Sequence, residues 1–174
     1  NFARNMVTAL VRIEGRPMGL IANSTRHLGG AIDSDAADKA ARFMQLCDAF
    51  GLPIISLCDA PGFMVGPDHE KTAMVRHTSR MFVVGANLSV PMITVVLRKA
   101  YGLGAMAMAG GSFQASLLTL SWPTGEFGAM GLEGAVKLGF KKELEAVAEG
   151  PERQALYDKL VKAAYTQEQA IQAA

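Results

Sequence analysis

The chain has 174 residues, of which 50% are hydrophobic and 19% are charged, so it can form one compact domain with an ordinary core. This composition excludes intrinsic disorder, a collagen repeat and a disulfide scaffold. Seventeen basic and sixteen acidic residues give a net charge of +1, which argues against a nucleic-acid partner.

The cysteines and the apolar runs point to a protein of the cytoplasm. Cys47 and Cys58 have apolar neighbours and no C-x-x-C spacing, which favours free thiols over a disulfide or a metal site. Residues 81–97 and 100–125 are uncharged runs, but Gly, Ser and other polar residues interrupt them, so we expect no membrane partner. The first residues lack an initiator Met and a leader, which indicates a chain cut from a longer one.

The first elements are predicted to be a β-hairpin and a helix. Residues 6–13 and 17–23 are β-prone and flank a short turn at residues 14–16. Asp33 and its neighbours offer N-cap oxygens to a helix that we expect to reach Phe50. Small and apolar residues fall on one face of this helix, namely Ala37, Ala40, Ala41, Met44 and Cys47.

The middle of the chain alternates strands with helices, which is typical of an α/β fold with largely parallel pairing. Residues 54–58 and 92–97 are short apolar runs that we predict to be buried strands, and a helix over residues 69–88 separates them. A Gly-rich turn, a helix of small residues at 104–109 and a strand at 117–122 follow.

The chain ends in a predicted amphipathic helix over residues 151–174, with Pro151 at its first position. Its apolar stripe consists of Leu156, Leu160, Ala163 and Ala164. Because no internal repeat or low-complexity linker interrupts the sequence, we expect residues 1–174 to form a single domain.

The Gly-rich segment at residues 98–108 is the strongest candidate site. Glycines allow a sharp turn and a close ligand approach, and the first N–H groups of the following helix have no partner within it. Such donors suit an oxyanion or a phosphate. The segment contains the spacing Gly-x-Gly-x-x-Ala, but Arg98 and Lys99 separate it from the predicted strand, which argues against a dinucleotide site. Close packing of helix on strand is the structural alternative.

Other chemistry-bearing residues give weaker signals. Asp59 begins a loop at the end of a buried strand, where open α/β folds place ligands, although Pro and Gly there also suit an ordinary turn. His69-Glu70 lacks the second His of a zinc motif, because Ala73 stands at that position. His77 is expected on a helix surface or as a hydrogen-bonded histidine of the core, and no Ser lies in a G-x-S-x-G elbow. An enzyme with this sequence would therefore depend on oxyanion stabilisation.

Several segments are informative together, in their order and spacing, although each is weak alone. They are Arg16-Pro17 with Ile21-Ala22-Asn23, residues 35–43 with Cys47-Asp48, Asp59-x-Pro61-Gly62-Phe63-x-x-Gly66 with Glu70, Val90-Pro91, Arg98-Lys99-Ala100-Tyr101-Gly102, and Trp122-Pro123-Thr124 with Met130-Gly131-x-Glu133-Gly134-Ala135-Val136. Over residues 6–140 the chain resembles the carboxyltransferase (beta) component of biotin-dependent acyl-CoA carboxylases, specifically its C-terminal crotonase-like domain.

The resemblance implies a ββα superhelix of the crotonase type and transfer of a carboxyl group from carboxybiotin, on a separate carrier, to an acyl-CoA. It implies that the backbone amides of Leu103 and Gly104 hold the ureido oxyanion of biotin, so that neither a protein base nor a metal is needed. Contacts to biotin or substrate are implied for Phe63, Gly66, Tyr101, Gly102, Ala105 and Met106.

The same resemblance implies a set of partners. In the family, the C-terminal domain receives biotin and the N-terminal domain receives coenzyme A, with the active site between two subunits. We therefore expect a homo-oligomer that works with a biotin carboxyl carrier and a biotin carboxylase, and an isolated domain that is inactive.

The chain also departs from the family pattern. Leu103 and Ala73 stand where Gly is usual, and Met106 occupies the acyl-pocket position, which favours an acyl group longer or less polar than acetyl. Two alternatives stay open: a biotin-dependent acyl-CoA decarboxylase subunit, and a catalytically incomplete assembly module. A self-contained crotonase is disfavoured because no paired carboxylates lie in the expected turns.

Overall fold

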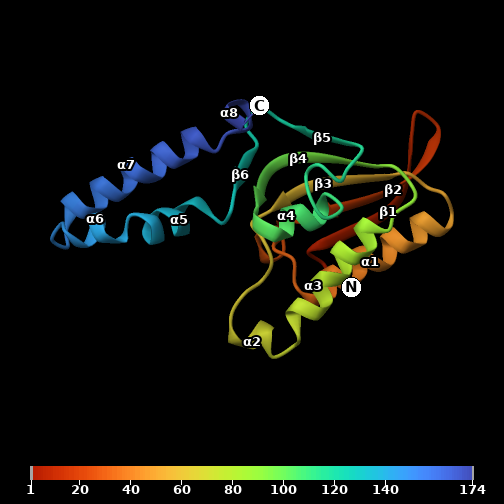
Figure 1. Ribbon diagram of the computed structural model, residues 1–174, viewed down its shortest axis with the longest axis horizontal. Helices are drawn as coiled ribbons and strands as arrows, with labels where there is room; N and C mark the ends of the chain where they lie inside the picture. The colour runs from red at the N-terminus through yellow and green to blue at the C-terminus, as the bar shows by residue number, and fades with distance from the viewer. Residues whose placement is uncertain (1, 174) are drawn as a thin grey trace.

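The computed structural model describes residues 2–173 and has a mixed sheet at its centre (Figure 1). Its strands are β1 (Met6–Ile13), β2 (Arg16–Asn23), β3 (Ile54–Ala60), β4 (Met92–Tyr101), β5 (Leu118–Ser121) and β6 (Glu126–Gly128). The strand order is β1-β2-β3-β4-β5, with β6 also paired to β4, and every pair except β1–β2 is parallel. The predicted α/β class is confirmed.

The predicted hairpin is confirmed, with a tighter turn than expected. β1 and β2 pair without interruption from Met6 opposite Asn23 to Ile13 opposite Arg16, so Arg16 belongs to the strand. Glu14 and Gly15 alone form the turn, and both have positive φ angles of 49° and 80°. Two such residues match the right-handed twist of the flanking strands.

The first helix, α1 (Ser34–Ala49), forms where its cap and apolar face predict. The carboxylate of Asp33 accepts a hydrogen bond from the N–H of Ala36 at 2.9 Å, which satisfies one N–H of the first turn. All five residues of the predicted apolar face are buried. Their small size lets α1 lie close to β2, where a side chain on Gly19 would collide with Cys47.

The predicted helix over residues 69–88 is broken in the structure. It consists of α2 (Pro67–Glu70) and α3 (Met74–Ala86), and Ala73 between them has a left-handed φ of 55°. This conformation favours glycine and interrupts a helix. α3 lies beside α1 against one face of the sheet (Figure 1).

β4 extends past its predicted end at residue 97 and includes Arg98 and Lys99. α4 (Gly102–Met108) therefore begins directly after the strand. The prediction that Arg98 and Lys99 separate the Gly-rich segment from the strand is therefore wrong. A short 3-10 helix, η1 (Leu28–Gly30), precedes α1.

The rest of the chain forms a helical arm that projects from the sheet (Figure 1). The arm consists of α5 (Leu132–Gly139), α6 (Lys141–Glu145) and α7 (Pro151–Gln167), followed by α8 (Ala170–Ala173). The predicted C-terminal helix thus ends at Gln167, and residue 174 lies outside the described residues. Within the predicted stripe, Leu156, Leu160 and Ala164 are half-buried, whereas Ala163 is exposed.

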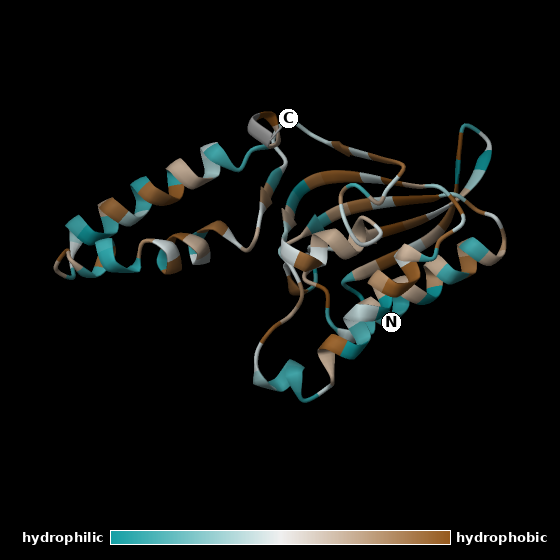
Figure 2. Cartoon of the chain, in the orientation of Figure 1, coloured by the Kyte–Doolittle hydropathy of each residue, from teal (hydrophilic) through white to brown (hydrophobic). Residues whose placement is uncertain are grey.

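The end of the chain returns to the sheet. The N–H of Phe127 donates to the carbonyl of Glu168 at 2.9 Å, and the N–H of Ala170 donates to the carbonyl of Gly125 at 2.7 Å. Apolar residues dominate the strands, whereas the arm alternates apolar and polar residues along its helices (Figure 2). Within residues 2–173, no helix has the length and apolar character that crossing a membrane requires.

Candidate functional site

The candidate site is the turn from β4 into α4. Gly102, the first residue of α4, has a φ of +57°, and a Cβ atom there would lie 2.8 Å from the carbonyl oxygen of Ala129. The backbone angle and the close contact both require a residue without a side chain. Glycine is therefore the residue type that this position requires.

A loop after β3 packs directly against the same turn. A Cβ atom on Gly104 would lie 2.6 Å from the carbonyl carbon of Gly62, so the two backbones are in contact there. Ile32 holds this loop on both sides, because its N–H donates to the carbonyl of Gly62 at 3.0 Å and its carbonyl accepts from the N–H of Met64 at 2.9 Å. The wall of the turn is thus fixed by main-chain contacts.

The turn offers two backbone donors. Leu103 and Gly104 lie in the first turn of α4, where N–H groups have no partner within the helix. Throughout residues 2–173, no turn, loop or side-chain hydrogen bond uses either N–H group. Donors of this kind can stabilise an oxyanion without a charged side chain.

The side chains of the turn divide into exposed and buried ones. Leu103 is 62% exposed and Met106 is 37% exposed. Gly104 and Ala105, by contrast, are buried against the sheet. A ligand at this turn would therefore meet backbone and apolar side chains.

The loop residues predicted to contact a ligand lie at different places. Phe63 is half-buried and packs edge to face on Phe82, with ring centroids 6.3 Å apart, next to the Gly62–Gly104 contact. Gly66 lies at the far end of the loop, where it precedes α2 with a φ of 115°. The structure thus places Phe63 beside the turn and Gly66 at the edge of the loop.

Tyr101 is the last residue of β4 and is only 1% exposed. Its hydroxyl donates a hydrogen bond to the carboxylate of Glu126 on β6. Burial, together with this carboxylate, raises the pKa of Tyr101 above its ordinary value. The side chain of Tyr101 therefore stays neutral and points into the protein.

A polar frame that we did not predict ties the ends of three strands together beside the turn. Asn23 on β2 donates to the carbonyl of Gly30 at 3.2 Å and accepts from the N–H of Asp59 at 3.1 Å. Asp59 on β3 in turn accepts from Arg98 at 3.2 Å and from the N–H of Lys99 at 3.2 Å. The motif residues Asn23 and Asp59 were visible in the sequence, but their pairing depends on strand register.

His77 lies between two helices and not in the turn. Nδ1 of His77 lies 2.8 Å from the carboxylate of Asp38, and Arg80 lies 2.9 Å from the same carboxylate, so these groups join α3 to α1. Over the described residues, no group of three or more His, Cys, Asp or Glu side chains is arranged to hold a metal.

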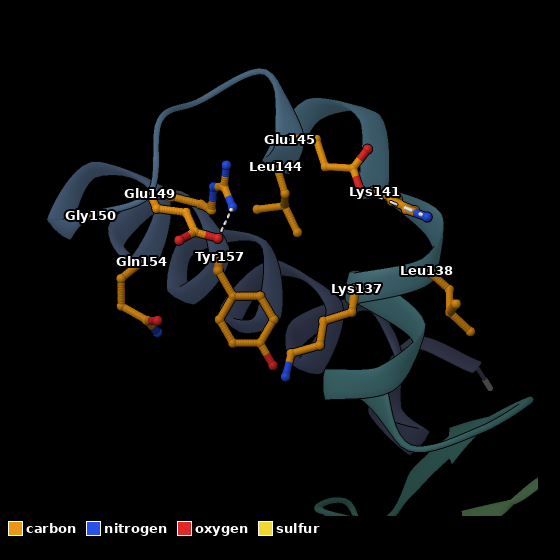
Figure 3. Close-up of a pocket in the computed structure, with 10 residues that line it drawn as sticks. Lys137, Leu138, Lys141, Leu144, Glu145, Glu149, Gly150, Gln154 and Tyr157 are labelled. Atoms are coloured by element: carbon orange, nitrogen blue, oxygen red, sulfur yellow. Dashed lines mark hydrogen bonds and ion pairs between the residues drawn. The ribbon is translucent and has the colours of Figure 1, made fainter.

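The helical arm contains a groove of about 630 Å³ between α5, α6 and α7 (Figure 3). Charged residues of both signs line it, and they pair with each other: Arg153 lies 3.3 Å from Glu149, and Lys141 lies 3.8 Å from Glu145. This balance of charge and its distance from the β4–α4 turn make the groove a poor candidate for the site.

Comparisons with known proteins match residues 1–174 to one family, described as the carboxyl transferase domain. The biotin-dependent acetyl-/propionyl-coenzyme A carboxylase beta5 subunit of Mycobacterium tuberculosis is 41% identical over 150 residues, covering 86% of this chain and 27% of that protein. The chain spans less than a third of the length of the first curated relatives that it matches.

Two solved structures share the fold. A single-chain, multi-domain long-chain acyl-CoA carboxylase is 62% identical, with a TM-score of 0.87 over 97% of this chain and 17% of that one. Transcarboxylase 12S, a hexamer with methylmalonyl-CoA bound, is 38% identical, with a TM-score of 0.83 over 95% of this chain and 31% of that one. The expected carboxyltransferase, crotonase-like fold is confirmed, and the chain belongs to the carboxyl transferase domain family.

Proposed function

We propose that this chain is the biotin-binding half of an acyl-CoA carboxyltransferase and forms the C-terminal domain of a longer, two-domain subunit. The observation that carries the proposal is the β4–α4 turn, where no described residue accepts a hydrogen bond from the N–H groups of Leu103 and Gly104 and where Gly102 lets β4 turn directly into α4. The family match and the words "biotin-dependent" in the name of the Mycobacterium tuberculosis relative support it.

The turn suits the ureido oxygen of biotin because both donors come from the main chain, whose course depends on Gly102 and Gly104 packing against the backbones of Ala129 and Gly62. The N–H groups of Leu103 and Gly104 donate to this oxygen as it gains negative charge. Carboxybiotin supplies the carboxyl group that is transferred. Phe63 lies beside the turn and Gly66 at the edge of the same loop, and together they form one side of the biotin site, while Tyr101, Gly102 and Ala105 fix the shape of the turn.

We propose further that the acyl group is longer than acetyl. Met106 presents an exposed apolar side chain on α4, three residues after Leu103. The 62% identical structure is that of a long-chain acyl-CoA carboxylase, which supports this choice of substrate. An apolar acyl chain would gain contact area with Met106 that acetyl lacks.

The full reaction needs partners. We propose a biotin carboxyl carrier, a biotin carboxylase and a second copy of the subunit, in the cytoplasm, where the free thiols of Cys47 and Cys58 stay reduced. β5 ends the strand order and carries exposed apolar side chains at Leu118 and Leu120, which supports an oligomer. The related transcarboxylase 12S is a hexamer.

A titration with two ligands tests the proposal. Amide NMR signals of residues 102–105 are followed while biocytin or coenzyme A is added to the chain. We expect shifts with biocytin and none with coenzyme A. Shifts with coenzyme A alone would indicate a self-contained crotonase, and no shift with either ligand would favour an assembly module.

A further inference from the structure

The β4–α4 turn packs against β6 and against the linker that follows it, residues 129–131. β6 pairs with the last residues of β4, Lys99 opposite Glu126 and Tyr101 opposite Gly128. A Cβ atom on Gly128 would lie 3.4 Å from Cδ1 of Tyr101. Three residues of β6 thus lie against the end of β4.

The linker also contacts the first residue of α4. The carbonyl oxygen of Ala129 lies 2.8 Å from the Cβ position of Gly102, so a shift of the linker would press on the turn or release it. On the opposite side, Gly62 contacts Gly104. The segment with the N–H groups of Leu103 and Gly104 is therefore packed between the backbones at residues 129 and 62.

One side-chain hydrogen bond joins β4 to β6. The hydroxyl of Tyr101 donates to the carboxylate of Glu126. Glu126 lies two residues before Gly128 on β6, so these two residues are on the same face of the sheet. With a side chain that is 1% exposed, Tyr101 cannot contact a ligand through its ring or hydroxyl. Its polar contact is with Glu126, whose side chain is half-buried.

Other charged and polar groups lie near this bond. Nζ of Lys99 lies 6.0 Å from the ring centroid of Tyr101, where it offsets the negative charge of the neighbouring carboxylates. Glu133, at the start of α5, accepts a hydrogen bond from the hydroxyl of Tyr165 on α7 at 2.6 Å. Burial raises the pKa of Tyr101, so its hydroxyl remains a donor through the neutral range.

We infer that Tyr101 and Glu126 are positioning residues, whose hydrogen bond fixes β6 on β4 and thereby sets the direction of the Leu103 and Gly104 amides. The inference rests on the proposed function, because it concerns the same turn. Misplacing a catalytic group by about 1 Å costs up to about a hundredfold in rate. Neither residue takes part in the chemistry itself.

Three variants in the assembled carboxylase test the inference. Y101F removes the hydroxyl and keeps the ring, and it should lower kcat about tenfold or more while KM for acyl-CoA changes less than about twofold. E126A should have a similar effect, and E126Q, which keeps an acceptor oxygen, should lose less than E126A. Y165F is the matched control, since it removes a Tyr–Glu hydrogen bond within the arm, and it should keep the wild-type kcat.

Hydrogen exchange of the same proteins gives a readout that does not depend on activity. We expect faster exchange of residues 101–109 in Y101F than in wild type or Y165F, with residues 6–23 unchanged. If Y101F matches Y165F in kcat and in exchange, the inference is wrong. If wild-type enzyme transfers no carboxyl group, the proposed function fails, and the exchange measurement still decides whether the bond positions the turn.

Discussion

The backbones of Gly104 and Gly62 are in direct contact, since a Cβ atom on Gly104 would lie 2.6 Å from the carbonyl carbon of Gly62. Real Cβ atoms do not approach a carbonyl carbon so closely. Gly104 therefore has two roles. It donates one of the proposed hydrogen bonds to the oxyanion, and it lets α4 pack directly on the loop after β3.

A larger residue at this contact should abolish most of the activity. G104V forces the Gly62 loop and the turn apart, and loss of one backbone donor costs roughly a hundredfold or more in kcat. The rate of carboxyl transfer by the assembled enzyme measures this effect. G134A is the control, because a Cβ atom there meets nothing within 4 Å and lies in α5. A wild-type rate for G104V would remove Gly104 from the proposed site.

Met106 should determine the preference for acyl-chain length. M106S removes an apolar surface, and each CH₂ group that loses burial costs about 0.8 kcal/mol, so we expect kcat/KM for octanoyl-CoA to fall about tenfold relative to propionyl-CoA. L138S is the control, because Leu138 is also an exposed apolar residue but lies on the arm. A wild-type enzyme that prefers acetyl-CoA would contradict the proposed substrate.

We expect the loss of the Asn23 side chain to lower the free energy of unfolding far more than the loss of an exposed amide. N23A leaves the carbonyl of Gly30 and the N–H of Asp59 without their partner, which should lower the free energy of unfolding by about 1–3 kcal/mol. N87A removes an exposed hydrogen bond to the carbonyl of Val83 and should cost less than about 0.5 kcal/mol. Equal losses in urea denaturation would show that the polar frame adds no stability.

Asp48 should make stability depend on pH. The hydroxyl and N–H of Ser89 both donate to its carboxylate at 2.8 Å, and these bonds lower the pKa of Asp48 below its ordinary value of 3.8. A lowered pKa stabilises the fold above the unfolded pKa, and this contribution is lost as pH falls through the folded pKa.

The measurement is thermal denaturation of wild type and D48N across this range. At neutral pH, D48N should melt at a lower temperature than wild type, and the difference should shrink below pH 3.8. D68N is the control, because Asp68 is exposed and its ion pair is with Lys71, the equally exposed residue that follows the same short helix. A difference that is constant with pH would rule out the charge of Asp48 as its cause.

The elements predicted correctly depend on residues close together in the sequence. The hairpin needs only Glu14-Gly15 between two β-prone runs, and α1 needs its Asp33 cap and one apolar face. The turn at Gly102 was likewise recognisable from local glycines. Local propensity and periodicity carry such information without knowledge of the fold.

The elements that the sequence did not predict depend on distant partners. β4 continues through Arg98 because Asp59, on another strand, pairs with that side chain and with the N–H of Lys99. β6 has only three residues and takes its hydrogen bonds from β4 and Glu168. Strand register decides these contacts, so no local pattern reveals them.

The two buried cysteines can report the order in which parts of the fold open. Burial raises the pKa of Cys58 on β3 to about 12 and also raises the pKa of Cys47 on α1, so both thiols are protonated and shielded in the folded chain. Alkylating reagents attack the thiolate, so each cysteine reacts only after its own element has opened. The order in which they are labelled will reveal whether the helix leaves the sheet before the strands part, with no engineered probe.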